Sequence, residues 1–147
     1  MRKDISYFKK IIWVIGLTIL VNLNLVFSNQ LWETANAEFN PVPVLWFDVI
    51  SPILLGIYIA ILLVKKWSIN INHALLWCIS APCLLLLLTY QTLVTLSTYE
   101  FLSESFSYEF TSTWPFKAII SMPTVFGIVG GMIFTLSLFG NRSNVTK

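Results

Sequence analysis

Apolar positions in this chain gather into four long stretches separated by polar segments. The stretches cover residues 11–28, 45–64, 74–96 and 118–139, and Asp48 is the only charged residue in any of them. Each stretch is about long enough to cross the roughly 30 Å hydrocarbon core of a bilayer. Backbone polar groups cannot stay unpaired in lipid, so each stretch is predicted to form a transmembrane helix. The sequence therefore predicts an all-α membrane protein, with one four-helix antiparallel domain over residues 1–147.

The basic residues are distributed unequally over the polar segments. One side of the predicted membrane has the basic residues Arg2, Lys3, Lys9, Lys10, Lys65, Lys66, Arg142 and Lys147. The other side has the predicted outer loops 29–44 and 97–117, where Lys117 is the only basic residue. Lysine and arginine favour the cytoplasmic side, so both termini are predicted to lie inside. Tryptophans near both predicted boundaries agree with this arrangement.

Composition excludes an ordinary soluble domain. Apolar types make up 56% of the chain, charged residues only 11%, and the mean hydropathy is +0.78. A soluble chain has about a quarter charged residues, so the outer surface here is expected to meet lipid. The net charge of +2 comes with no basic stripe interleaved with aromatic residues, and nucleic acid is therefore not an expected partner.

The first apolar stretch has a second interpretation. A basic start, an apolar run and Ala35-Asn36-Ala37 resemble a secretory signal peptide with its cleavage site. Cleavage there would remove residues 1–37 and leave three spans. The apolar run of stretch one is long for a signal peptide, which favours a retained helix.

Small residues recur along one face of the fourth stretch and of the second. Gly127 and Gly131 form a GxxxG pattern, and Gly56 and Ala60 are their counterparts in the second stretch. Small residues allow close approach of helix backbones in lipid. The pattern predicts a packing face within the bundle, or a face for a second copy or another membrane protein.

Polar groups are confined to one half of the predicted membrane. A candidate outer polar cluster consists of Asn22, Asn24, Asp48, Gln91 and Lys117. Asp48 and Lys117 are expected either to pair or to reach water and lipid headgroups separately. The inner halves are almost purely apolar, which argues against a continuous polar path for ions or protons. Pro82 is the expected kink of the third stretch, and residues 105–111 alternate aromatic and polar types as an extended segment does.

Candidate chemistry is nearly absent from the sequence. His73 is the only histidine, and Cys78 and Cys83 lie too far apart along one predicted helix for a disulfide. No catalytic residue, cofactor or metal site is therefore expected. The composition favours a non-enzymatic protein of a bacterial cytoplasmic membrane, either an accessory subunit or an immunity-type protective protein. A small transporter with an outward-facing polar site is the alternative.

Overall fold

The computed structural model describes residues 2–64, 69, 71–101, 109 and 111–139. Over this part of the chain nearly every residue is helical and no strand occurs. Three helical runs are long and apolar enough to cross a membrane, at Lys10–Glu38, Val42–Leu63 and His73–Thr98, and a shorter apolar helix follows at Pro123–Phe139. The all-α prediction is confirmed. The chain forms two compact units, Met1–Val44 and Leu45–Lys147, and each is described by itself.

The first unit is dominated by α1, Arg2–Glu38, which continues ten residues beyond the predicted span 11–28. Much of the expected outer loop 29–44 is therefore helix. Polar residues from Asn29 onward end the apolar stretch, but none of them before Glu38 is a glycine or proline, so nothing in the backbone stops the helix. At about 1.5 Å per residue, α1 is roughly 56 Å long.

The end of α1 is a turn that lacks the usual glycine. Phe39 has a φ of 53°, and the Asn40 N–H donates to the Ala35 carbonyl oxygen at 3.1 Å. This is the Schellman arrangement, in which a left-handed residue follows the last helical turn. The Asn40 side-chain oxygen then accepts from the Val42 N–H at 3.1 Å, so one asparagine joins the end of α1 to the start of α2, Val42–Leu63.

The second unit contains most of α2 and the helices that follow. One continuous helical run is formed by α3, His73–Leu75, a π-helical turn η1, Leu76–Ser80, and α4, Ala81–Thr98. The π turn ends two residues before Pro82, the expected kink. Proline has no N–H for the carbonyl four residues earlier and its ring crowds that carbonyl, and a π turn is one way to relieve both problems. Here the Ala81 N–H donates to the Leu76 carbonyl.

The predicted span 118–139 is divided into two helices, α6, Trp114–Ser121, and α7, Pro123–Phe139. Met122 breaks the helix with a φ of −144° and a ψ of 53°. The residue before a proline is disfavoured in the α conformation, so Pro123 explains the break. At 17 residues, α7 alone is about 26 Å long.

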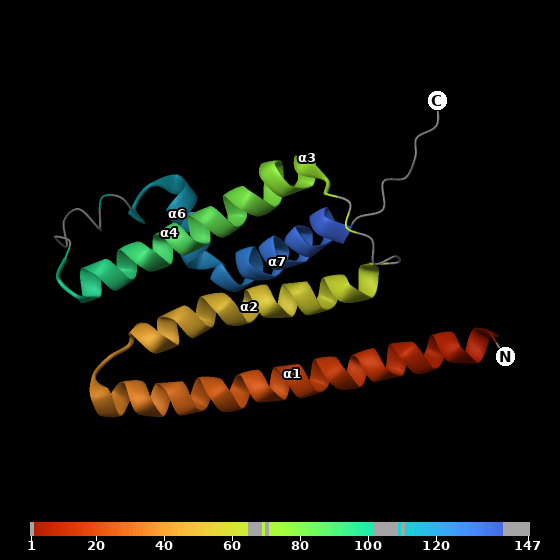
Figure 1. Ribbon diagram of the computed structural model, residues 1–147. Coiled ribbons are helices and arrows are strands. Elements are labelled where there is room, and N and C mark those ends of the chain that lie inside the picture. The colour runs from red at the N-terminus through yellow and green to blue at the C-terminus, as the bar shows by residue number, and fades with distance from the viewer. Residues whose placement is uncertain (1, 65–68, 70, 102–108, 110, 140–147) are drawn as a thin grey trace. The chain divides into compact units, whose positions relative to one another are not determined.

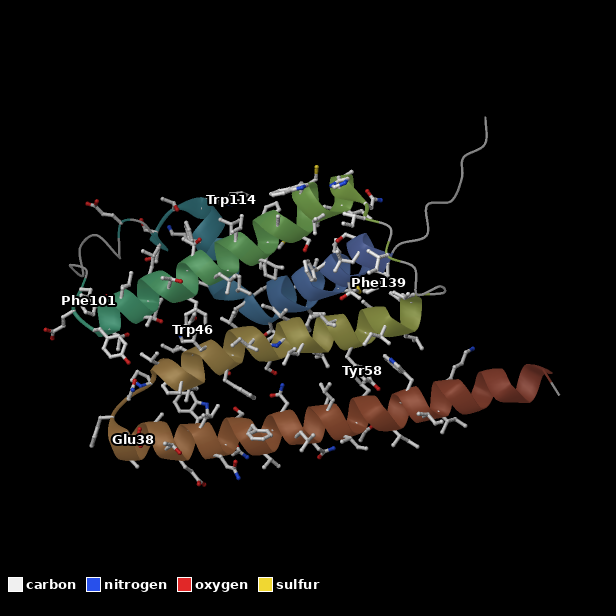
Figure 2. The ribbon with its side chains drawn as sticks, viewed as in Figure 1. Glu38, Trp46, Tyr58, Phe101, Trp114 and Phe139 are labelled. Carbon is white, nitrogen blue, oxygen red and sulfur yellow. The ribbon has the colours of Figure 1, made fainter. Side chains whose placement is uncertain are left out.

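Side by side, α2, α4 and α7 make up the body of the second unit (Figure 1). Its core is built from Val49, Leu87 and Ile119, one residue each from α2, α4 and α6. Trp46 and Phe101 lie toward one end of this unit and Phe139 toward the other (Figure 2), and we call these the Trp46 end and the Phe139 end.

A backbone hydrogen bond links the residue before α3 to the last turn of α7. At the Phe139 end, the Asn72 N–H donates to the Ser137 carbonyl oxygen of α7 at 2.7 Å, and the Asn72 side chain caps α3. The predicted extended segment 105–111 lies largely outside the described residues.

Candidate functional site

The second unit buries polar side chains beside its apolar core and exposes large apolar side chains on its surface. Five polar side chains are buried, namely Ser51, Ser80, Gln91, Thr135 and Ser137. Large apolar side chains of the same helices are exposed, among them Leu54, Trp77, Leu85 and Val125. In water this distribution would be unfavourable, because burial of apolar surface drives folding there. It is the distribution expected of a helix bundle whose surroundings are apolar.

Glycines bring α2 and α7 together by a reciprocal contact. A Cβ added at Gly131 of α7 would overlap the carbonyl oxygen of Ile53 in α2, and one added at Gly56 of α2 would overlap the carbonyl oxygen of Ile128 in α7. Each glycine thus lies against the backbone of the other helix. Such an approach permits Cα–H···O contacts and close van der Waals packing, the interactions that hold helices together in lipid.

The other predicted small residues extend this α2–α7 contact. A Cβ at Gly127 would lie 2.8 Å from the Cβ of Pro52. Ala60 of α2 is completely buried. The four predicted residues Gly56, Ala60, Gly127 and Gly131 are therefore all buried within this chain, and this leaves little of their face for a partner.

A second contact of α7 was not expected from the sequence. A Cβ at Gly130 would lie 2.9 Å from a methyl carbon of Leu84, so this glycine admits α4 on a different side of α7. The buried Ser80 hydroxyl in the π turn donates to the Gly130 carbonyl oxygen at 3.3 Å. The sequence signal was the doublet Gly130-Gly131, since adjacent glycines on a helix point to two different neighbours.

At the Trp46 end, a short chain of polar groups joins α2 to α4. The Trp46 indole N–H donates to the Thr95 hydroxyl oxygen at 3.1 Å, and the Thr95 hydroxyl donates to the backbone carbonyl oxygen of Gln91 at 2.8 Å. Gln91 itself is only 3% exposed, and its side-chain nitrogen Nε2 has no hydrogen-bond partner among the residues that the structure describes. A buried amide of this kind is costly, since most buried polar groups in proteins are paired.

Three residues of the candidate outer polar cluster, Asp48, Gln91 and Lys117, belong to the second unit. Asp48 and Lys117 are both exposed, and within the described part of the chain they form no ion pair. Asp48 precedes the buried Val49, and Lys117 follows the buried Phe116. Packing of these two apolar side chains turns the neighbouring charged side chains away from the core. Of the predicted polar residues in this unit, only Gln91 is in the interior.

The two asparagines of the predicted cluster belong to the first unit. Asn22 is exposed, and its side-chain nitrogen donates to the Thr18 carbonyl oxygen of the same helix at 2.8 Å. Asn24 is half-buried. Their membership of a shared site with Asp48, Gln91 and Lys117 stays a prediction.

Reactive side chains are dispersed. His73 and Cys78 are exposed, Cys83 is half-buried, and both thiols are free. Among the residues that the structure describes, no group of three histidine, cysteine, aspartate or glutamate side chains is placed to hold a metal ion.

Comparison with known proteins adds no relative: no family model, curated protein or solved structure matches the chain.

Proposed function

We propose that this chain is a multi-pass protein of a bacterial cytoplasmic membrane that acts through contacts, with no chemistry of its own. It would be an accessory subunit or an immunity-type protective protein that blocks a pore-former within the bilayer. The observation that carries the proposal is the exposure of many large apolar side chains on the second unit, while serine, threonine and glutamine side chains are buried beside its apolar core. A protein so built requires lipid or another membrane protein around it.

The proposal includes four spans, with both termini inside. Three spans correspond to the long apolar helices, and the fourth would be α7 with the help of α6, since α7 alone falls short of the roughly 30 Å hydrocarbon core. An even number of spans leaves both termini on one side, and the lysine and arginine distribution favours the cytoplasmic side. In the second unit, Trp46 lies at one end, while the exposed Trp77 is in η1, close in sequence to Asn72, which is hydrogen-bonded to Ser137 at the Phe139 end; residues of two aromatic belts would be placed in this way.

Single-cysteine labelling tests this topology. In a chain with Cys78→Ala and Cys83→Ala, Phe39→Cys would report the turn between α1 and α2, and His73→Cys the start of α3. We expect a membrane-impermeant maleimide to label Phe39→Cys in intact cells and His73→Cys only after permeabilisation. Both positions are exposed, so access to the reagent depends on the side of the membrane alone. Labelling of both from outside, or the reverse pattern, would overturn the proposed orientation.

A contact role is favoured because the glycine faces are used within the chain, while other helix surfaces stay apolar and exposed. Leu85 of α4 and Trp77 of η1 are 60% and 67% exposed, and both can meet a partner helix as well as lipid. Purification in mild detergent is the test. A stable hetero-complex would support the contact role. Recovery of the chain free of any other protein, under conditions that keep membrane complexes intact, would count against it.

A small transporter, or a transporter subunit, is the second candidate. Its support is the buried and unpaired amide of Gln91, since polar groups buried among transmembrane helices commonly belong to substrate sites. A homo-oligomer that encloses a polar lumen in detergent would favour this candidate over the first.

A further inference from the structure

Gln91 lies at a depth where water or lipid headgroups are close. Along α2, Trp46 is hydrogen-bonded to Thr95 and Val49 packs on Leu87, so Asp48, which lies between these two residues of α2, is level with the part of α4 that carries Gln91. Asp48 is exposed. An ionised carboxylate is costly in the hydrocarbon core, so this level of the bundle must be near the polar boundary.

On the boundary side of Gln91, a hydrogen bond between Trp46 and Thr95 joins α2 to α4. The Thr95 hydroxyl donates a hydrogen bond to the backbone carbonyl oxygen of Gln91 and accepts one from the Trp46 indole N–H. If α2 and α4 moved apart here, Thr95 would keep the first bond and lose only the second. Opening would therefore break the Trp46–Thr95 bond, and it would allow water to pair with the amide of Gln91.

Below Gln91 the path is closed by apolar packing. One turn deeper on α4, Leu87 is completely buried against Val49 and Ile119. A water molecule has no polar partner in this layer, so the layer is closed to water and to reagents for as long as α2 and α4 stay together.

From these contacts we propose that the Trp46 end of α2 and α4 is a gate, with the Trp46–Thr95 hydrogen bond as its latch and Gln91 as the inner wall of a shallow polar site. The site takes water, and the unpaired amide favours its entry. The gate goes beyond the proposed contact function: its depth rests on the proposed membrane location, but its contacts are all within α2, α4 and α6 and need no partner protein.

The test measures water access to the core layer while Gln91 stays in place. Val49→Cys, in the chain with Cys78→Ala and Cys83→Ala, puts a thiol directly beneath the gate. The purified full-length chain in detergent would be treated with N-ethylmaleimide, and the labelling rate followed by mass spectrometry. Labelling of Thr92→Cys, an exposed position on α4, gives the rate of an open thiol.

Removal of the latch should open the gate. We expect Thr95→Val to raise the labelling rate of Val49→Cys by about fivefold, as loss of one net hydrogen bond would. Trp46→Phe should act alike, and the double variant should label no faster than either single variant, since all three lose the same bond. Thr92→Val is the matched control, because the Thr92 hydroxyl also donates to a backbone carbonyl of α4, that of Leu88 at 2.8 Å, but accepts no indole.

Removal of the amide should have the opposite effect. Gln91→Met keeps the length of the side chain and leaves no unpaired group, so we expect slower labelling of Val49→Cys and a higher unfolding temperature. Two results would overturn the proposal. One is a labelling rate with Thr95→Val and Trp46→Phe no higher than with Thr92→Val. The other is faster labelling or a lower unfolding temperature with Gln91→Met, which would mean that a fixed water or a packing role already satisfies Gln91.

Discussion

Single residues set how closely the helices of the second unit approach, and the sequence indicated some of them. The spacing of Gly127 and Gly131 predicted a close helix contact, and Gly131 lies against the backbone of Ile53. The identity of that neighbour could not be predicted, because a pattern along one helix does not specify the register of the next. Gly130 was overlooked for the same reason, since its partners Leu84 and Ser80 are far away in the sequence.

Gly131→Ala should lower the free energy of unfolding by about 1–3 kcal/mol. The added methyl would overlap a backbone oxygen of α2, which cannot move without moving the helix. Gly130→Ala is the control, because its methyl would meet the flexible end of Leu84, and the helix-favouring effect of alanine, about 1 kcal/mol, would offset part of the cost. Both variants would be unfolded in detergent and followed by circular dichroism. Equal losses would mean that the α2–α7 approach does not limit stability.

At the scale of elements, the types and approximate places of the helices followed from the apolar stretches, but their ends did not. Polar residues after Ser28 ended the predicted span, whereas the helix ends only at the left-handed Phe39. The helix α4 ends in the same way at Glu100, with a φ of 59° and the Phe101 N–H donating to the Leu96 carbonyl oxygen. Neither stop has the glycine by which such turns are recognised, so composition alone could not reveal them.

The break between α6 and α7 allows a test of local against tertiary causes. Pro123→Ala would supply an N–H for the carbonyl of Ile119, and we expect Met122 to become helical and to join the two helices. The restored hydrogen bond should change stability by only about 0.5–1.5 kcal/mol. The ¹³Cα chemical shift of Met122 would report its conformation.

Pro43→Ala is a suitable control for that substitution. This proline is in the first turn of α2, where no intrahelical partner is lost. A Met122 that stays extended in Pro123→Ala would show that packing of α6 on the core, and not the proline, imposes the break.

At the scale of the whole molecule, the number of spans and their orientation rest on charge and length, while the division into two units is a property of the folded chain. No feature of the sequence announced that division, because it depends on which residues meet in space. Every contact of α7 described above, with α2, η1, α4 and Asn72, lies within Leu45–Lys147.

This internal completeness predicts that the second unit stays folded after the chain is cut between α1 and α2. A protease site inserted after Phe39, which is 93% exposed, would allow the cut to be made in the purified protein, after all helices have inserted normally. The core of Val49, Leu87 and Ile119 and the Gly56–Gly131 contacts would be untouched. We expect the unfolding temperature of the second unit to shift by less than about 4 °C, which corresponds to less than about 1 kcal/mol for a domain of this size. The uncut protein with the same insertion is the control.

A large drop of the unfolding temperature on cutting would mean that residues 1–44 hold the second unit together. The signal-peptide interpretation, which removes residues 1–37, would then be excluded, because a chain without its first helix could not keep its fold.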